Sequence, residues 1–225
     1  MDEIELVIFD CDGVLVDTEK LANRIFIEEL SKFGFALTEE EAWDNFPGSR
    51  FATCVTYVED TNGKKLPPEF SEVYKTRSAE VFASEVKPIP GIEEVLANLK
   101  LPRAVASNGP KHTVKLNLIT SGLIQYFEDD HLFSAYQIQK WKPEPDLHLS
   151  VSKQLGIAPS KCVVIEDSVP GAQAAIAAGM NVIGFLHAGR NQKIYSLKIP
   201  MIEHMEELFQ YGFMKNVKVI SPSFP

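Results

Sequence analysis

The chain has 225 residues, 45% of them hydrophobic, which is enough for one sizeable core and a smaller second unit. Its formal net charge is -9, and Lys and Arg are scattered along the sequence. Binding to nucleic acid or to an anionic membrane needs clustered basic residues, so we expect neither partner. An anionic substrate would need a locally basic pocket.

The cysteines and the N-terminus indicate the compartment. Cys11, Cys54 and Cys162 form no CxxC pair and are odd in number, so neither a disulfide framework nor a zinc site is expected. The first residues, MDEIELVIFD, carry acids where a secretory signal carries basic residues, and no apolar run approaches the roughly 20 residues that span a bilayer. We therefore expect a cytoplasmic protein.

The first predicted element is a strand over residues 5–10 (ELVIFD), whose unbroken apolar run is typical of a strand covered on both faces. Two acids, Asp10 and Asp12, follow this run, and Gly13 comes next. An acid pair at the end of a strand is by itself most often a turn or a loop cap. Its meaning therefore depends on what the other strands carry at their ends.

The segment from Thr18 to Val86 is predicted to be helical. Apolar residues recur with helical spacing in LANRIFIEELSKFGF (21–35) and in SEVYKTRSAEVFASEV (71–86), with no comparable strand pattern between them. The Pro and Gly of VKPIPG (86–91) are typical of a linker that returns the chain to the sheet. We therefore predict a core of residues 1–17 and 87–225 and an inserted helical unit of residues 18–86.

Further strands are predicted after this insertion, in RAVASN (103–108), KCVVIED (161–167) and NVIGFL (181–186), each followed by a helical pattern. Their alternation with helices predicts an α/β fold with a Rossmann-like, doubly wound parallel sheet. The helix in VPGAQAAIAAGM (169–180) has Pro170 near its start and Gly179 near its end. Ligands of such sheets bind at the carboxyl ends of the strands.

Polar side chains stand at these strand ends. Ser107 and Asn108 end one strand, Glu166 and Asp167 end another, and Lys142 follows the short run LFSAY (132–136). Because parallel strand ends converge on one edge, we expect these groups and the first acid pair around one crevice. Clustered carboxylates suit Mg²⁺, which is usually shared with a substrate phosphate. Taken alone, Glu166 and Asp167 would equally suit the N-terminus of the next helix.

Within such a crevice the acid pair has a chemical interpretation. Gly13 can bend the chain by reaching φ > 0, so that Asp10 lies in line with a phosphorus atom while Asp12 reaches the leaving oxygen. One carboxylate would attack, and the other would transfer the proton. The cation Lys142 and the donors of Ser107 and Asn108 could hold the remaining phosphate oxygens.

Four segments resemble the motifs of the haloacid dehalogenase superfamily, in order and at familiar spacings: DCDGVLVDTE (10–19), SNG (107–109), KWKPEPD (140–146) and VVIEDSVPGAQAAIAAGM (163–180). The resemblance covers nearly the whole chain. The helical insertion after the first motif is similar to the C1-type cap of the β-phosphoglucomutase-like subgroup. Within this subgroup, SNGP and WKPEPD most resemble sugar-phosphate phosphatases of the 6-phosphogluconate phosphatase type.

The resemblance implies roles for the motif residues. Asp10 would be the nucleophile that forms an aspartyl-phosphate, and Asp12 would protonate the leaving alcohol and then activate water. Asp10, the backbone carbonyl of Asp12 and Asp167 would ligate Mg²⁺, with Glu166 a direct or water-mediated ligand. The phosphoryl oxygens would be bound by Ser107, Asn108 and Lys142.

One residue of the insertion is a further candidate. Arg50 ends the sequence PGSR (47–50), a turn that could present its guanidinium to the non-reacting end of a substrate. A surface arginine without a ligand is the alternative. The histidines show no metal-ligand spacing such as HExxH.

These observations predict an Mg²⁺-dependent phosphatase that acts on a small phosphomonoester, a phosphorylated sugar or sugar acid. A phosphosugar mutase is the alternative, although the resemblance would then require a histidine where this chain has Ala22. A signalling receiver domain would leave Asp12 without a role, and a non-catalytic binding protein is not favoured because no motif residue is missing. The sequence leaves open which sugar is bound and whether the protein is a monomer or a dimer.

Overall fold

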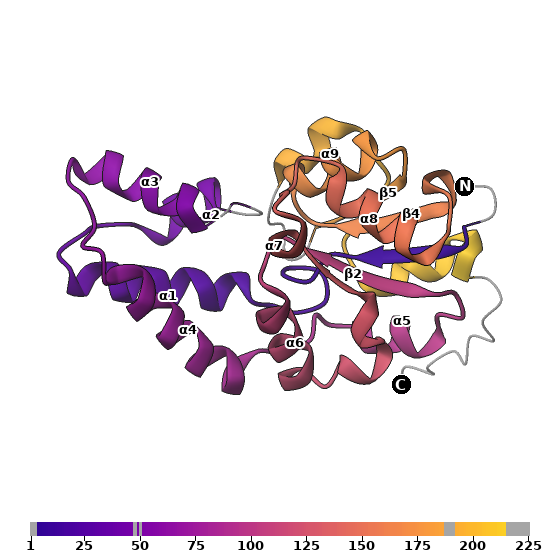
Figure 1. The fold of residues 1–225 in the computed structure, drawn as a ribbon, viewed down its shortest axis with the longest axis horizontal. Helices are drawn as coiled ribbons and strands as arrows, with labels where there is room; N and C mark the ends of the chain where they lie inside the picture. Colours follow the sequence, from indigo (N-terminus) through magenta and orange to yellow (C-terminus); the bar gives the residue numbers. More distant parts are fainter. Residues whose placement is uncertain (1–3, 47–48, 50, 187–191, 215–225) are drawn as a thin grey trace, which may run out of the picture.

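The computed structural model describes residues 4–46, 49, 51–186 and 192–214. Its centre is a six-stranded parallel sheet with the order β3-β2-β1-β4-β5-β6, the order of a Rossmann-like fold (Figure 1). The predicted α/β fold class is thereby confirmed. β3 and β6, with three and two residues, are not among the predicted strands because they are too short to give a sequence pattern. The strands are β1 (Leu6–Phe9), β2 (Arg103–Ser107), β3 (Leu132–Ser134), β4 (Cys162–Glu166), β5 (Asn181–Phe185) and β6 (Met201–Ile202).

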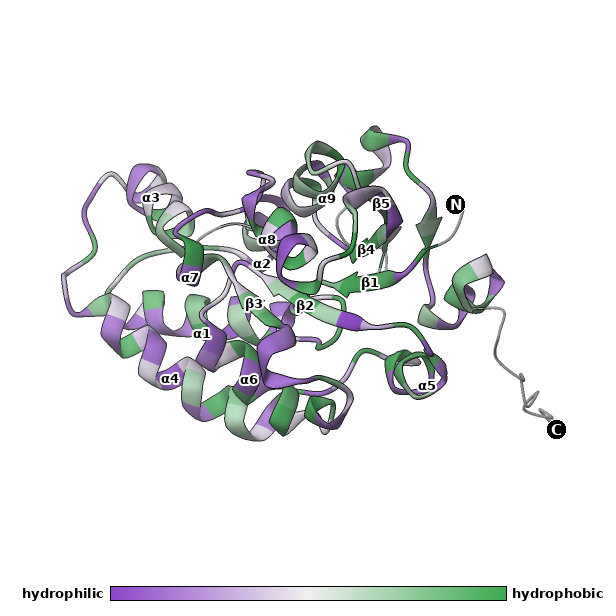
Figure 2. Ribbon diagram, turned by 45° about the vertical axis from the view of Figure 1, so that its right-hand side comes forward, coloured by the Kyte–Doolittle hydropathy of each residue, from purple (hydrophilic) through white to green (hydrophobic). Residues whose placement is uncertain are grey.

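Helices cover both faces of this sheet. In β1, Val7 and Phe9 point into one apolar cluster, while Leu6 and Ile8 point into another, as the alternation of side chains along a strand requires. Side chains of α5 and α6 complete the first cluster, and those of α8 and α9 complete the second (Figure 1). Figure 2 shows the apolar character of β1 and β4 between these layers. The helices are α5 (Ile92–Asn98), α6 (Lys111–Thr120), α7 (Ala135–Ile138), α8 (Asp146–Leu155) and α9 (Val169–Ala177).

The ends of these helices follow from their sequences. At the start of α9, the Ser168 hydroxyl accepts a hydrogen bond from the backbone N–H of Gly171 at 3.1 Å. At the end of α8, Gly156 takes the left-handed conformation with φ 66°. None of the helices described combines the length and the apolar character needed to cross a bilayer. Short 3-10 helices complete the connections: η1 (Ile124–Tyr126), η2 (Asp129–His131), η3 (Pro159–Lys161), η5 (Gln192–Leu197), η6 (Met205–Gln210) and η7 (Gly212–Met214).

A helical insertion, α1 to α4, lies between β1 and α5 and forms the lobe on the left of Figure 1. Its apolar faces meet around Phe26, whose ring makes edge-to-face contacts at centroid distances between 5.3 and 5.9 Å with Phe46, Phe51, Phe70 and Tyr74. The insertion thus has an apolar cluster of its own. Its division from the core as a separate domain stays a prediction. The helices are α1 (Glu19–Lys32), α2 (Glu39–Asn45), α3 (Phe51–Asn62) and α4 (Phe70–Glu85).

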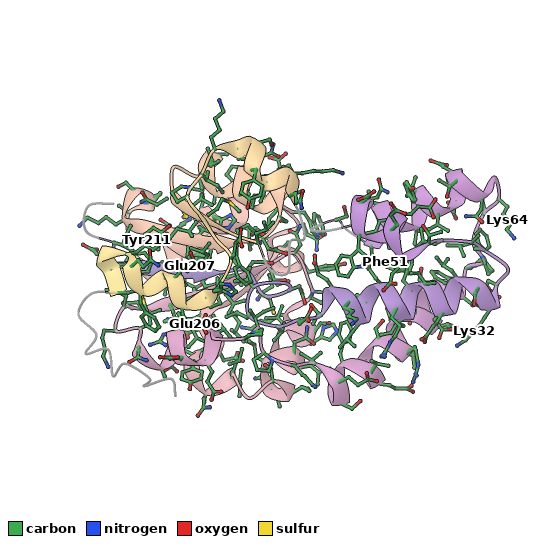
Figure 3. The ribbon with its side chains drawn as sticks, turned by 180° about the vertical axis from the view of Figure 1, so that it is seen from behind. Lys32, Phe51, Lys64, Glu206, Glu207 and Tyr211 are labelled. Carbon is green, nitrogen blue, oxygen red and sulfur yellow. The ribbon has the colours of Figure 1, made fainter. Side chains whose placement is uncertain are left out.

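The insertion contacts the sheet region on two sides. Ile25 of α1 and Phe82 of α4 belong to the same buried cluster as the side chains of β1. On the other side, the ammonium of Lys193 in η5 donates to the backbone carbonyl of Asp44 in α2 at 2.8 Å. Figure 3 shows Phe51 at the end of α3 that faces the sheet. The space between these two contacts is therefore bounded by both parts of the chain.

Candidate active site

The predicted polar residues lie together at the carboxyl ends of β1, β2 and β4. Asp10 follows β1, Ser107 ends β2 and Glu166 ends β4, and all three are buried. β1 pairs in parallel with both β2 and β4, so the residues that follow these strands share one edge of the sheet. The expectation from the sequence, that these groups surround one crevice, agrees with this placement.

The Lys142 ammonium bridges two of these acids. It donates hydrogen bonds to Oδ1 of Asp10 at 2.6 Å and to Oε2 of Glu166 at 2.7 Å. Its own backbone N–H donates to Oδ1 of Asn108 at 2.9 Å, which fixes the segment that carries it. Although burial opposes its charge, attraction by Asp10 and Glu166 raises the pKa of Lys142. The group is therefore a permanent cation at neutral pH.

Three carboxylates at this edge form a candidate metal site. Asp10, Glu166 and Asp167 each offer an oxygen within 4.8 Å of the others. Burial, reinforced by Glu166, raises the pKa of Asp10 to about 8 against the opposing effect of Lys142. Burial also raises the pKa of Asp167 well above its ordinary value, and repulsion from Glu19 and Glu166 adds to it. The Lys142 ammonium pairs with two of these three acids, and their carboxylate oxygens form a donor set that fits a hard divalent cation such as Mg²⁺.

Two glycines leave room for these acids. Gly13 has φ +84°, and a Cβ built on it would lie 2.3 Å from Oδ2 of Asp167. A Cβ on Gly171 would lie 2.0 Å from Oε2 of Glu166. Ser168 holds Glu166 from the other side, since its N–H and its hydroxyl donate to Oε1 at 3.2 and 2.8 Å. Any larger residue at either glycine would displace a carboxylate of the cluster.

Asp12 has different partners from the acid cluster. The Thr18 hydroxyl donates to Oδ1 of Asp12 at 2.5 Å, and Nδ2 of Asn117 in α6 donates to the same oxygen at 3.4 Å. Burial raises the pKa of Asp12, and the hydrogen bond from Thr18 is the largest opposing effect. A carboxyl group whose pKa is raised suits alternation between acid and base at neutral pH. Because Thr18 directly precedes α1, this group is also linked to the insertion.

Asn108 supplies an unpaired donor at the same edge. Its Oδ1 accepts from Lys142, while its buried Nδ2 has no hydrogen-bond partner among the residues described. A buried N–H without a partner is costly, on the order of 1–3 kcal/mol, so such a group marks a place where a ligand oxygen fits. Ser107 lies next to it and accepts a hydrogen bond from the Gly109 N–H at 2.9 Å.

A cavity of about 380 Å³ opens beside Lys142, between α3 of the insertion and the segment 139–144. Its volume is that of a site for a small molecule. It is lined by Ser49, Thr53, Gln139, Lys140, Trp141, Lys142, Pro143, Glu144 and Pro170. The predicted substrate contact Arg50 lies outside the residues described.

Sequence reasoning missed two residues of this site. Thr18 stands inside the first motif, although nothing in the motif says that it binds Asp12. Asn117 lies on the apolar face of α6 with Val114 and Leu118, and a polar residue in such a stripe was a usable signal. The catalytic and binding roles assigned from the sequence stay predictions for all of these residues: Asp10, Asp12, Ser107, Asn108, Lys142, Glu166 and Asp167.

Comparison with known proteins places the chain in a family. The model of the haloacid dehalogenase-like hydrolases matches residues 7–185. The 6-phosphogluconate phosphatase of Escherichia coli (strain K12) is 35% identical over 209 residues, which cover 92% of this chain and 94% of that protein. The likeness therefore extends over the sheet and the insertion together.

Solved structures agree. A haloacid dehalogenase-like protein of unknown function from Agrobacterium tumefaciens has a TM-score of 0.82 at 32% identity, over 91% of this chain and 96% of its own. A hydrolase of the same family from Deinococcus radiodurans, solved with bound phosphate and sodium, has a TM-score of 0.79 at 30% identity, over 97% and 99%. The predicted enzyme class, a phosphoric monoester hydrolase, is confirmed. The chain belongs to the haloacid dehalogenase-like hydrolase family.

Proposed function

We propose that the protein is an Mg²⁺-dependent phosphatase that hydrolyses a small phosphorylated sugar or sugar acid through an aspartyl-phosphate on Asp10. One observation carries this proposal: Asp10 lies 2.6 Å from the buried Lys142 ammonium, and the Lys142 backbone N–H donates to Asn108, whose Nδ2 has no partner among the residues described. A nucleophilic carboxylate, a cation and an open N–H donor are the groups that transfer of a phosphoryl group needs. The relation to 6-phosphogluconate phosphatase supports a sugar-acid or sugar phosphate as substrate.

In the first step, a carboxylate oxygen of Asp10 attacks phosphorus, and the bond from phosphorus to the ester oxygen breaks. The protonated Asp12 gives its proton to the departing alkoxide. Lys142 and Asn108 hold phosphoryl oxygens, and the positive charge of Lys142 reduces the repulsion between Asp10 and the phosphate. When bound by Asp10, Glu166 and Asp167, Mg²⁺ would supply further positive charge and favour the ionised form of Asp10.

In the second step, water attacks the phosphorus of the aspartyl-phosphate, and the bond to Asp10 breaks. Asp12, now ionised, takes a proton from that water, and inorganic phosphate leaves. Each carboxylate thus returns to its starting state. The raised pKa of Asp12 is compatible with both of its roles.

The division into a core of residues 1–17 and 87–225 and a cap of residues 18–86 is part of the proposal. A cap that closes over the strand ends would exclude water while phosphorus is attacked and would admit it for hydrolysis. The cavity between α3 and the segment 139–144 supports this arrangement. The buried free thiols Cys11, Cys54 and Cys162 are in keeping with action in a reducing cytoplasm.

The proposal is tested by phosphate release from a panel of sugar phosphates, phosphorylated sugar acids and nucleotides, with Mg²⁺ and with a chelator. We expect turnover of one class with Mg²⁺, and its loss both in the chelator and in Asp10→Asn. An intact protein without Mg²⁺-dependent turnover of any phosphoester would overturn the proposal. Interconversion of sugar phosphate isomers would identify a mutase instead, although Ala22 packs against the apolar core where the mutase resemblance requires a histidine.

A further inference from the structure

The cavity beside Lys142 has room for more than a phosphoryl group. Its 380 Å³ is lined by Lys142 and the rest of the segment 139–144, and also by Thr53 in α3. A phosphoryl group bound by Lys142 would occupy part of it, and the rest of a phosphorylated substrate would occupy the remainder. The side chains away from Lys142 therefore decide which substrates fit.

Lys140 is the cation that lines the cavity beside Lys142 among the residues that the structure describes. The charge of Lys142 is already shared by Asp10 and Glu166, whereas the Lys140 ammonium has no ion-pair or hydrogen-bond partner in the described part of the chain. The protein as a whole carries a charge of -9, so a lysine free to bind an anion in this cavity is notable. Lys140 thus provides the local positive charge that an anionic ligand needs in an acidic protein.

The other polar groups of the lining suit a hydroxylated ligand. The Thr53 hydroxyl has no hydrogen-bond partner among the residues described, and it lies in the same cavity. Gln139 donates through Nε2 to the Tyr136 carbonyl at 2.7 Å, which leaves its Oε1 as an acceptor. These groups can accept or donate hydrogen bonds to the hydroxyls of a sugar chain between the two lysines.

We infer that Lys140 binds the carboxylate of a phosphorylated sugar acid, at the end of the substrate remote from the phosphoryl group. The inference rests on the proposed function and names its substrate class. A single ammonium matches the single charge of a carboxylate. A second phosphate, with its dianionic charge, would need more than one cation, and the part of the lining that the structure describes adds the acid Glu144 instead.

The test compares two substrates that differ at one carbon. In 6-phosphogluconate C1 is a carboxylate, and in glucitol 6-phosphate it is a hydroxymethyl group. We expect Lys140→Ala to lower kcat/KM for 6-phosphogluconate about tenfold, which is the usual effect of losing a hydrogen bond to a charged group. The kcat/KM for glucitol 6-phosphate should change less than about twofold. Lys140→Arg should keep most of the preference, because the charge stays.

Two further variants control the result. Lys153→Ala removes an exposed lysine of α8 outside the cavity and should leave both substrates unchanged. Glu144→Gln removes the acid of the lining and should raise kcat/KM for 6-phosphogluconate relative to glucitol 6-phosphate. Equal losses on both substrates in Lys140→Ala, or no loss on either, would overturn the inference while the phosphatase itself stands.

Binding without turnover separates the inference from the proposed function. In Asp10→Asn, the rise in Tm caused by 6-phosphogluconate should exceed that caused by glucitol 6-phosphate, and Lys140→Ala in this background should remove the difference. Fructose 1,6-bisphosphate, compared with fructose 6-phosphate, reports on a second phosphate. A preference for the bisphosphate that depends on Lys140, in place of one for the sugar acid, would refute the carboxylate assignment.

Discussion

The ammonium of Lys142 lies 2.6 Å from the carboxylate of Asp10, although the two residues are 132 positions apart in the chain. Both side chains are almost inaccessible to solvent. The same ammonium lies 2.7 Å from Glu166, so it is the central counter-charge of a buried group of acids. Stability and catalysis are therefore both expected to depend on this one cation.

Lys142→Met should reduce both the unfolding free energy and kcat. Without the ammonium, Asp10 and Glu166 face each other without a counter-charge, and removing one partner of a buried ion pair costs about 3 kcal/mol of unfolding free energy. The phosphoryl oxygens also lose a donor, so we expect kcat to fall by at least about 100-fold. Urea unfolding and steady-state kinetics measure the two effects. The double variant Lys142→Met, Glu166→Gln should recover part of the unfolding free energy but none of the activity. A wild-type kcat in Lys142→Met alone would contradict the role assigned to Lys142.

Thr18 should set the pKa of Asp12. Its hydroxyl donates to the charged form of Asp12 at 2.5 Å, so it holds the pKa of that carboxyl down. In Thr18→Val this pKa rises, and a higher pH is needed to produce the base form that activates water. We expect the acidic limb of the kcat profile to move to higher pH, with kcat at neutral pH about tenfold lower.

The control for this prediction is Thr18→Ser, which keeps the hydroxyl and should keep the wild-type pH profile. Asn117→Leu is a second test, because Asn117 donates to the same oxygen at the longer distance of 3.4 Å. This substitution should move the acidic limb of the kcat profile in the same direction, but by less. A pH profile that is the same in Thr18→Val and in the wild type would show that this hydroxyl does not act on the catalytic proton.

Gly13→Ala should weaken Mg²⁺ binding. The new methyl group would lie 2.3 Å from Oδ2 of Asp167, so this carboxylate has to move out of the acid cluster. The left-handed φ of +84° adds a backbone cost of about 1–2 kcal/mol. Gly63→Ala is a matched control, because Gly63 also has a left-handed φ but a Cβ there meets nothing within 4 Å. We expect both variants to lose stability, and only Gly13→Ala to need more Mg²⁺ for half-maximal activity.

Much of the acid cluster could be predicted from sequence, because Asp10 and Glu166 come directly after apolar runs that form neighbouring strands. Parallel strands bring their carboxyl ends together whatever the loops do. Lys142 follows a strand of only three residues, and its position became predictable through the order of the motifs rather than through an apolar run.

The rest of the site depends on how separate elements pack, which periodicity does not specify. Thr18 reaches Asp12 only because α1 starts where it does, and Asn117 reaches it only because α6 lies on that face of the sheet. Thr53 and Lys140 face one cavity because α3 lies over the segment 139–144. Contacts of this kind join segments far apart in sequence. A pattern within one segment can mark a polar residue such as Asn117 on an apolar face, but it does not identify the partner of that residue.

His148 should make the protein sensitive to acid. It is fully buried in α8, and neither ring nitrogen has a hydrogen-bond partner in the described part of the chain. Burial, helped by the charge of Lys142, lowers the pKa of His148 well below 6.5. Below pH 6.5 the unfolded chain therefore binds a proton that the folded protein does not, and the unfolding free energy falls as the pH falls.

The expected loss is about 1.4 kcal/mol for each pH unit below 6.5, until the lowered pKa of the folded state is reached. His148→Leu replaces the ring with an apolar side chain and removes this proton from the unfolded state, so its unfolding free energy should fall less steeply from pH 6.5 to 5. The carboxylates titrate alike in both proteins, and the difference between the two urea-unfolding series therefore isolates His148. His112→Leu, at an exposed position of α6, should keep the wild-type slope. If the unfolding free energy fell equally steeply with pH in His148→Leu and in the wild type, His148 would take up its proton in the folded state as readily as in the unfolded chain.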